Sequence, residues 1–147
     1  MNEFSTITAF RLVRRLAIGE NSTSMYLLIC EEAAQPVIES DLTAEVEVQM
    51  GNALPIGRVS EHGDIDDSLG LPDSGPIRAL WIDRWSPKLV AALDTHVVRL
   101  ERTGAQFLFI TTPALAEQLL TEAPNFRNRL TEVLHIVPDA AMEVASR

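Results

Sequence analysis

The chain has 147 residues, of which 46% are apolar and 22% charged, and its formal net charge is −9. This length and composition suit one globular domain with a real core and argue against a disordered chain. Its apolar runs are far shorter than the roughly 20 residues of a membrane helix, and its start lacks the basic-then-apolar order of a signal peptide. Because Cys30 is the single cysteine, no internal disulfide can form. We therefore expect a cytoplasmic protein with a buried, unreactive thiol.

Acidic residues are concentrated in residues 31–74, which hold eleven acids and one base, Arg58, for a net charge of −10. The remaining residues hold ten acids and eleven bases, which leaves them at +1. An acidic surface repels phosphate backbones, so nucleic acid is not expected as a partner. The acidic residues either serve solubility alone or dock a basic partner surface, and the sequence leaves both readings open.

The first third of the chain predicts a helix followed by a buried strand. Apolar residues at helical spacing predict a helix over residues 4–18, with Ser5 or Thr6 as its cap. The run MYLLIC, residues 25–30, shows no alternation of apolar and polar residues. Such a run is typical of a strand that is buried on both faces, as in a parallel sheet.

Residues 36–50 are compatible with two structures. Pro36 suits the first turn of a helix, and several apolar residues share one helical face. Alternation of alanine, valine and methionine with glutamate and glutamine also fits an exposed strand. We expect the helix. Residues 54–60 then predict a weak second strand, and residues 61–76 predict a solvated loop in preference to a metal site.

The second half of the chain predicts strands and helices in alternation. Residues 77–83 and 105–111 are apolar runs of strand length, and each is followed by a hydroxyl residue and a proline, beginning at Ser86 and Thr112. A capping hydroxyl before a proline is a typical helix start. Residues 131–137 predict the last strand.

This order of elements predicts an α/β fold. Strands that alternate with crossover helices imply a mostly parallel sheet covered on both faces. We therefore expect a three-layer sandwich with a roughly five-stranded sheet, P-loop NTPase-like or Rossmann-like, in a single domain over residues 1–147.

Three segments of the second half resemble parts of a known nucleotide-binding fold. ALWID resembles a Walker B strand with Asp83 in place of its acid, and FLFITT resembles a sensor strand with Thr111 or Thr112 at its tip. APNFRNRLTEVLHI resembles the arginine-bearing segment before the last strand, with Arg127 and Arg129. Together with a helix before the first strand, this order is similar to that of STAND/AAA-type P-loop NTPases over nearly the whole chain.

The phosphate loop of that family is missing. CEEAAQPVIES, residues 30–40, stands in its place without a glycine or a lysine, although the loop needs glycines to surround phosphates and a lysine to balance their charge. Glu31 and Glu32 place two negative charges there, and unit charges about 5 Å apart repel by roughly 1–3 kcal/mol at intermediate dielectric. Arg84 follows Asp83, where a catalytic glutamate often stands. The resemblance therefore implies an inactive version, without enzyme activity or a cofactor.

Similar nucleotide-free domains serve as protein-binding or signal-sensing adaptors in bacterial conflict and immunity systems, so the resemblance implies a protein partner. A homo-oligomer is compatible with it, whereas membrane, nucleic acid and metal are not expected. Open α/β sheets bind their ligands beyond the carboxyl ends of the strands. The candidate interface at that edge consists of Asp83, Arg84, Trp85, Arg127 and Arg129. Trp85 either caps the core or anchors the partner there.

An alternative function belongs to another class of protein. A small Rossmann-like or flavodoxin-like domain would bind a small ligand at the carboxyl ends of its strands. This alternative predicts a concave pocket beside Asp83, Thr111 and Thr112.

Overall fold

The computed structural model describes residues 4–18, 24–59, 77–84, 86–102 and 106–140. Its strands form one six-stranded sheet in the order β1-β6-β2-β5-β4-β3, and every pairing is parallel. The strands are β1 Thr6–Thr8, β2 Met25–Ile29, β3 Ile56–Val59, β4 Ile77–Ile82, β5 Gln106–Thr111 and β6 Glu132–Val137. The predicted α/β sandwich is confirmed, with a sheet that is entirely parallel and has six strands where roughly five were expected.

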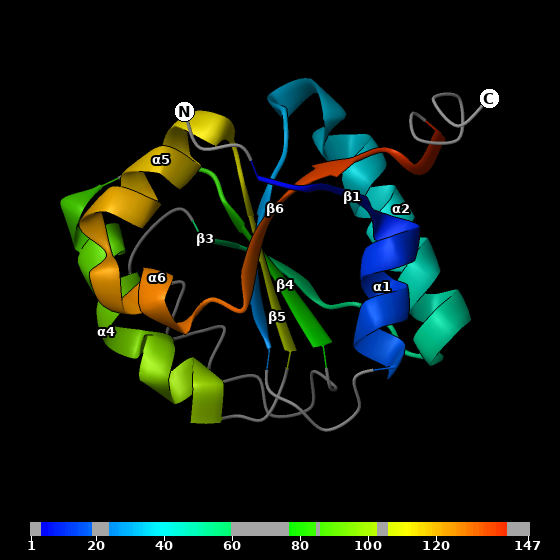
Figure 1. Cartoon of the computed structure of the whole chain (residues 1–147), viewed down its shortest axis with the longest axis horizontal. Coiled ribbons are helices and arrows are strands. Elements are labelled where there is room, and N and C mark those ends of the chain that lie inside the picture. Colours follow the sequence, from blue (N-terminus) through cyan, green and yellow to red (C-terminus); the bar gives the residue numbers. More distant parts are fainter. Residues whose placement is uncertain (1–3, 19–23, 60–76, 85, 103–105, 141–147) are drawn as a thin grey trace.

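Helices cover both faces of this sheet (Figure 1). Helices α1 and α2 lie on one face, and α4, α5 and α6 lie on the other. The helical segments are α1 Ala9–Ile18, the 3-10 turn η1 Glu32–Ala34, α2 Gln35–Met50, α4 Pro87–Arg102, α5 Pro113–Glu122 and α6 Pro124–Arg129. Among the described residues, no helix combines the length and apolar character needed to cross a bilayer.

The sheet separates two hydrophobic cores. Along β2, Tyr26 and Leu28 belong to the core under α1 and α2, whereas Met25, Leu27 and Ile29 belong to the core under the other helices. All five side chains are buried. This burial on both faces explains why MYLLIC shows no alternation, and it confirms the strand predicted there.

The predicted helix over residues 4–18 is wrong at its start. Thr6–Thr8 form strand β1, which pairs with β6 at one edge of the sheet, and the helix begins only at Ala9. Two β-branched threonines around a β-branched isoleucine favour extended backbone. The helix is capped by Thr8, whose Oγ1 accepts the N–H of Arg11 at 3.3 Å, and not by Ser5 or Thr6.

The ambiguous residues 36–50 are helical, as expected. Ile38, Leu42 and Val46 lie one turn apart and are all fully buried, which an exposed strand would not allow. The helix ends at Gly51, whose φ of 69° is the left-handed conformation that favours glycine at this position.

Helix starts in the second half follow the prediction in part. Ser86 caps α4, because its Oγ accepts the N–H of Leu89 at 3.1 Å. Thr112 precedes α5 as predicted, but its side chain makes no capping hydrogen bond.

Helix α6 was not predicted as a separate helix. Asp94 of α4 caps it by accepting the N–H of Phe126 at 3.0 Å, a contact that sequence spacing does not reveal.

Several predictions fall outside the described residues. These are the solvated loop over residues 61–76 and the placement of Trp85. The predicted strands over residues 54–60, 77–83 and 131–137 correspond to β3, β4 and β6.

The strand order separates this sheet from two common doubly wound folds. In both the Rossmann and the flavodoxin order, the first strand of the fold lies beside the second. Here β1 lies beside β6, β2 lies between β6 and β5, and two strands separate β2 from β3, which lies at the far edge. As a result, the carboxyl ends of β2, β5 and β4 lie side by side. Residues 30, 112 and 83, in that order, follow these three strand ends.

Asp139 connects the end of β6 to the start of α1. One of its carboxylate oxygens accepts the N–H of Phe10 at 3.2 Å, and its own N–H donates to Asp41 at 3.1 Å. Burial raises the pKa of Asp139, and the charges of Asp41 and Glu45 raise it further, against the opposing effect of the backbone hydrogen bonds. The folded state therefore binds this proton more tightly than the unfolded chain does.

We expect Asp139→Asn to gain stability relative to the natural chain as pH rises. Protonation of Asp139 stabilises the fold fully below the unfolded pKa, and this contribution is lost as pH rises through the higher folded pKa. Asparagine keeps an acceptor for Phe10 but carries no charge. Thermal unfolding from about pH 3 to pH 7 measures the difference in Tm. The control, Asp139→Ala, also loses the acceptor and should cost about 1 kcal/mol. A difference in Tm between Asp139→Asn and the natural chain that does not change with pH contradicts this account.

Candidate functional site

The carboxyl ends of the three central strands are tied together by their own hydrogen bonds. The N–H of Cys30 donates to the carbonyl of Thr111 at 2.8 Å, which extends the pairing of β2 with β5. The Thr111 hydroxyl donates to the carbonyl of Ile82 at 2.9 Å, which joins β5 to β4. Thr111 is fully buried. Its hydroxyl hydrogen is therefore used inside the sheet, and the residue at the sensor-like position acts as a structural link.

The backbone at the phosphate-loop position folds on itself. The N–H of Ala34 donates to the carbonyl of Glu31 at 3.0 Å, and the N–H of Gln35 donates to the carbonyl of Glu32. Pro36 has no N–H. Three consecutive positions at the start of α2, Ala34 to Pro36, therefore have no N–H left to offer a phosphate, although phosphate binding at a helix start depends on such groups. Glu31 and Glu32 are both exposed at this turn.

Asp83 at the end of β4 is paired with an arginine. The Nη1 atom of Arg58 on β3 lies 3.3 Å from Oδ2 and 3.4 Å from Oδ1 of Asp83. Its Nη2 atom lies 3.4 Å from Oε2 of Glu39 on α2, and its guanidinium lies 5.6 Å from the ring centroid of Trp81. Arg58 thus places a positive charge beside the carboxylate that would face a magnesium ion in a nucleotide site. Arg58 would compete with a bound cation for this carboxylate.

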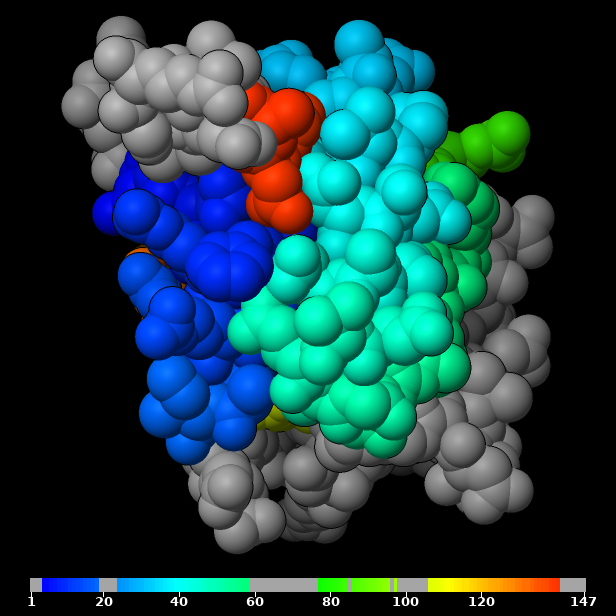
Figure 2. All heavy atoms as spheres, turned by 90° about the vertical axis from the view of Figure 1, so that its right-hand side faces the viewer, coloured from blue at the N-terminus to red at the C-terminus, as the bar shows by residue number. Residues whose placement is uncertain are grey.

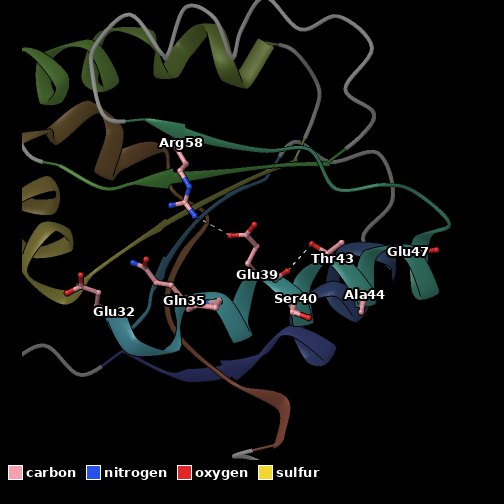
Figure 3. Close-up of a pocket in the computed structure, with 9 residues that line it drawn as sticks. Glu32, Gln35, Glu39, Ser40, Thr43, Ala44, Glu47 and Arg58 are labelled. Carbon is pink, nitrogen blue, oxygen red and sulfur yellow. Dashed lines mark hydrogen bonds and ion pairs between the residues drawn. The ribbon is translucent and has the colours of Figure 1, made fainter.

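An open groove of about 790 Å³ runs between Arg58 and helix α2 (Figure 3). Figure 3 shows Arg58 reaching from β3 toward Glu39, with Glu32 and Glu47 nearer the two ends of the groove. Three glutamates and one arginine line it, so the groove is acidic. Such a surface suits a cationic group better than a phosphate.

A second cavity of about 410 Å³ lies on the other face of the sheet, against α5. Phe4, Ile29, Pro113, Ala116 and Leu120 supply its apolar walls, and the polar lining residues are Glu117, Thr121, Arg127 and His135. The His135 ring lies 6.1 Å from the ring of Phe4, tilted by 49°. Asp83, Thr111 and Thr112 line neither this cavity nor the acidic groove.

The candidate interface residues are divided between two places. Asp83 contacts the α2 side through Arg58, and Arg84 is exposed directly after it. Arg127 instead lines the second cavity on the α5 side, and Arg129 is exposed at the end of α6. Trp85 lies outside the described residues.

Sequence reasoning did not name Arg58 and Glu39 as site residues. Arg58 is the only base between residues 31 and 74, and that isolation was the signal that could have identified it. A lone cation within an acidic segment is expected to find carboxylate partners. The sequence did not show which carboxylates Arg58 would meet. The pairing of β3 with β4 places Arg58 opposite Trp81, and Asp83 lies two residues after Trp81.

Cys30 is unsuited to nucleophilic chemistry. The side chain is buried, and its Sγ donates to the carbonyl of Glu31 at 3.2 Å. Burial, followed by the charge of Glu31, raises the pKa of the Cys30 thiol to about 11. Since the thiolate is the reactive form, we expect iodoacetamide at about pH 8 to label the folded protein far more slowly than the urea-unfolded chain. Mass spectrometry measures the labelling. Equal labelling rates in the folded and unfolded states would show that the Cys30 thiol is accessible in the folded protein, which would contradict this expectation.

Comparison with known proteins adds no family to this description. No protein-family model matches the chain, and no curated protein sequence matches it significantly.

Proposed function

We propose that this chain is a non-enzymatic adaptor, which binds another protein or senses a signal through a P-loop NTPase-like fold that no longer holds nucleotide. Domains of this kind act in bacterial conflict and immunity systems. The observation that carries the proposal is the turn that leads into α2. There Ala34 and Gln35 use their N–H groups internally, and Pro36 has none. An acidic turn without these three donors, without glycine and without lysine is a poor replacement for the water that solvates a triphosphate.

The strand order supports the same proposal. A nucleotide site of this family needs the phosphate loop, the Walker B acid and the sensor residue at one edge, and β5 lies between β2 and β4 to bring those three positions together. Each position has a different use in this chain. Asp83 pairs with Arg58, and Thr111 binds the carbonyl of Ile82.

The proposed partner site is the part of this edge around Asp83 and Arg84. Arg84 is exposed, and arginine is enriched in protein interfaces because its planar group donates several hydrogen bonds in a fixed geometry. Trp85 follows it in the sequence, and tryptophan is enriched among residues that dominate binding energy. The proposal therefore rests on an exposed cation that is followed in the sequence by an aromatic residue.

A pull-down from the native cytoplasm tests this site with three forms of the tagged protein. We expect the natural chain and Lys88→Glu to retain the same protein, and Arg84→Glu to lose it. Lys88 is the matched control because it is an exposed cation in the first turn of α4, and its reversal changes the net charge equally. Retention of the protein by Arg84→Glu, or the absence of any protein that distinguishes the variants, contradicts the proposal.

The second cavity favours one further candidate function, the binding of a small ligand. Its volume lies within the usual range of ligand pockets, roughly 300–1,000 Å³, and four polar side chains, those of Glu117, Thr121, Arg127 and His135, interrupt its apolar walls. Because Arg127 and Glu117 both line it, the expected ligand carries an anionic group for Arg127 and a cationic or hydrogen-bond-donating group for Glu117. A metabolite library screened by thermal shift tests it, with Arg127→Ala as the comparison. A hit that survives this substitution, or no hit at all, counts against the ligand site.

A further inference from the structure

The large exposed apolar side chains of the described residues are gathered on one face. They are Phe10, Ile18, Val37 and Val48, with exposures of 46%, 72%, 47% and 80%. The first two belong to α1 and the others to α2, which lie side by side on that face (Figure 2). Single exposed apolar residues are common on protein surfaces, so the charges of these two helices decide what this face could bind.

The two helices of this face carry opposite charges. Helix α1 holds Arg11, Arg14 and Arg15 and no acid, whereas α2 holds four acids and no base. Arg15 pairs with Glu132 at 3.4 Å. Within the described part of the chain, Arg11 and Arg14 are exposed and make no ion pair with a carboxylate of α2 or of any other element. A basic helix and an acidic helix therefore lie next to each other. Of the four acids of α2, Glu47 is exposed, Glu39 pairs with Arg58, and Asp41 and Glu45 are partly buried.

We infer that this α1–α2 face is the interface of a homodimer, in which α1 of each copy packs on α2 of the other. A two-fold axis parallel to the helices and midway between α1 and α2 produces this arrangement. The arginines of each copy's α1 then face the acids of the other copy's α2, so the favourable contact occurs twice. An axis across the helices would instead place α1 on α1 and bring arginines together. The charge pattern thus selects one symmetric arrangement of two identical copies.

The occupant is a second copy because the face is complementary to itself. A basic or an acidic partner would meet a helix of its own charge on half of the surface, whereas a second copy meets opposite charge on both halves. Sixteen residues give α2 a length of about 24 Å and ten give α1 about 15 Å; with each helix about 10 Å wide, the two copies together bury about 800 Å². That area is smaller than in stable interfaces, so the dimer is weak and reversible and weakens further in high salt.

Charge reversal on each helix tests this arrangement directly. Arg11→Glu with Arg14→Glu makes both helices acidic, and Ser40→Lys with Glu47→Lys makes the exposed side of α2 basic. All four positions are exposed, so the fold should tolerate the changes. In sedimentation experiments from about 5 to 500 μM, we expect the natural chain to form dimers and each double variant to stay monomeric. An equimolar mixture of the two variants should recover dimers, because each acidic α1 then meets a basic α2.

A matched control separates this inference from the proposed partner site. Arg84→Glu with Lys88→Glu changes the net charge as much as the α1 variant does, but it lies away from the α1–α2 face and should leave the dimer unchanged. A monomeric natural chain, an α1 variant that remains dimeric, or a mixture that stays monomeric overturns the inference. Each of these results leaves the pull-down experiment on Arg84 unaffected, since the two surfaces are different.

Discussion

Phe109→Ala is expected to lower the free energy of unfolding by about 3–5 kcal/mol, because it removes a large aromatic side chain from the centre of a packed core. Phe109 lies in β5, near the middle of the sheet, and is fully buried. Its ring meets that of Phe126 edge-on, with centroids 5.0 Å apart and planes at 79°. Alanine would leave a cavity between the sheet and α6. Because domains are typically stable by about 5–15 kcal/mol, this loss is a large part of the total.

Urea denaturation of the natural chain and the variant measures this effect. Gln118→Ala is the matched control because it shortens an exposed side chain of α5 away from the α1–α2 face, and it should change the stability by less than about 0.5 kcal/mol. A double-mutant cycle with Phe126→Ala should also show coupling, since edge-on aromatic pairs contribute about 0.5–1.5 kcal/mol beyond their burial. A loss below about 1 kcal/mol for Phe109→Ala would contradict the packing described for this core.

Thr111→Val is expected to cost about 1–3 kcal/mol although it barely changes the volume of the side chain. The buried hydroxyl donates to the carbonyl of Ile82, and valine removes that donor inside the core. Thr112→Val is the matched control, because Thr112 is partly exposed and its side chain makes no capping hydrogen bond. Equal stability of the two variants in urea denaturation would show that the Thr111 bond does not hold β4 and β5 together.

The sequence predicted the parts of the fold that local pattern determines. Runs of mostly apolar residues marked β2, β4 and β5, because strands buried on both faces need apolar residues at most positions. Pro87 and Pro113 marked helix starts for an equally local reason. These features depend on neighbours in the sequence, and so a single sequence contains them.

Features that depend on distant contacts were missed. Strand β1 forms because Thr6–Thr8 can pair with β6, more than 120 residues later, while the same residues also fit a helical spacing. Helix α6 is capped by Asp94 from α4. At the candidate site, Arg58 reaches Asp83 only because β3 pairs with β4, and Arg127 lies apart from Asp83 on the opposite side of the sheet. Residue types alone do not determine such pairings.

The central claim is that the turn before α2 cannot hold a triphosphate, and equilibrium dialysis with labelled ATP and magnesium tests it most directly. With no free N–H at Ala34, Gln35 or Pro36, and with Glu31 and Glu32 beside them, we predict no saturable binding up to about 1 mM ATP. Saturable binding of ATP that Pro36→Gly strengthens would contradict the account, because it would place the nucleotide at this turn.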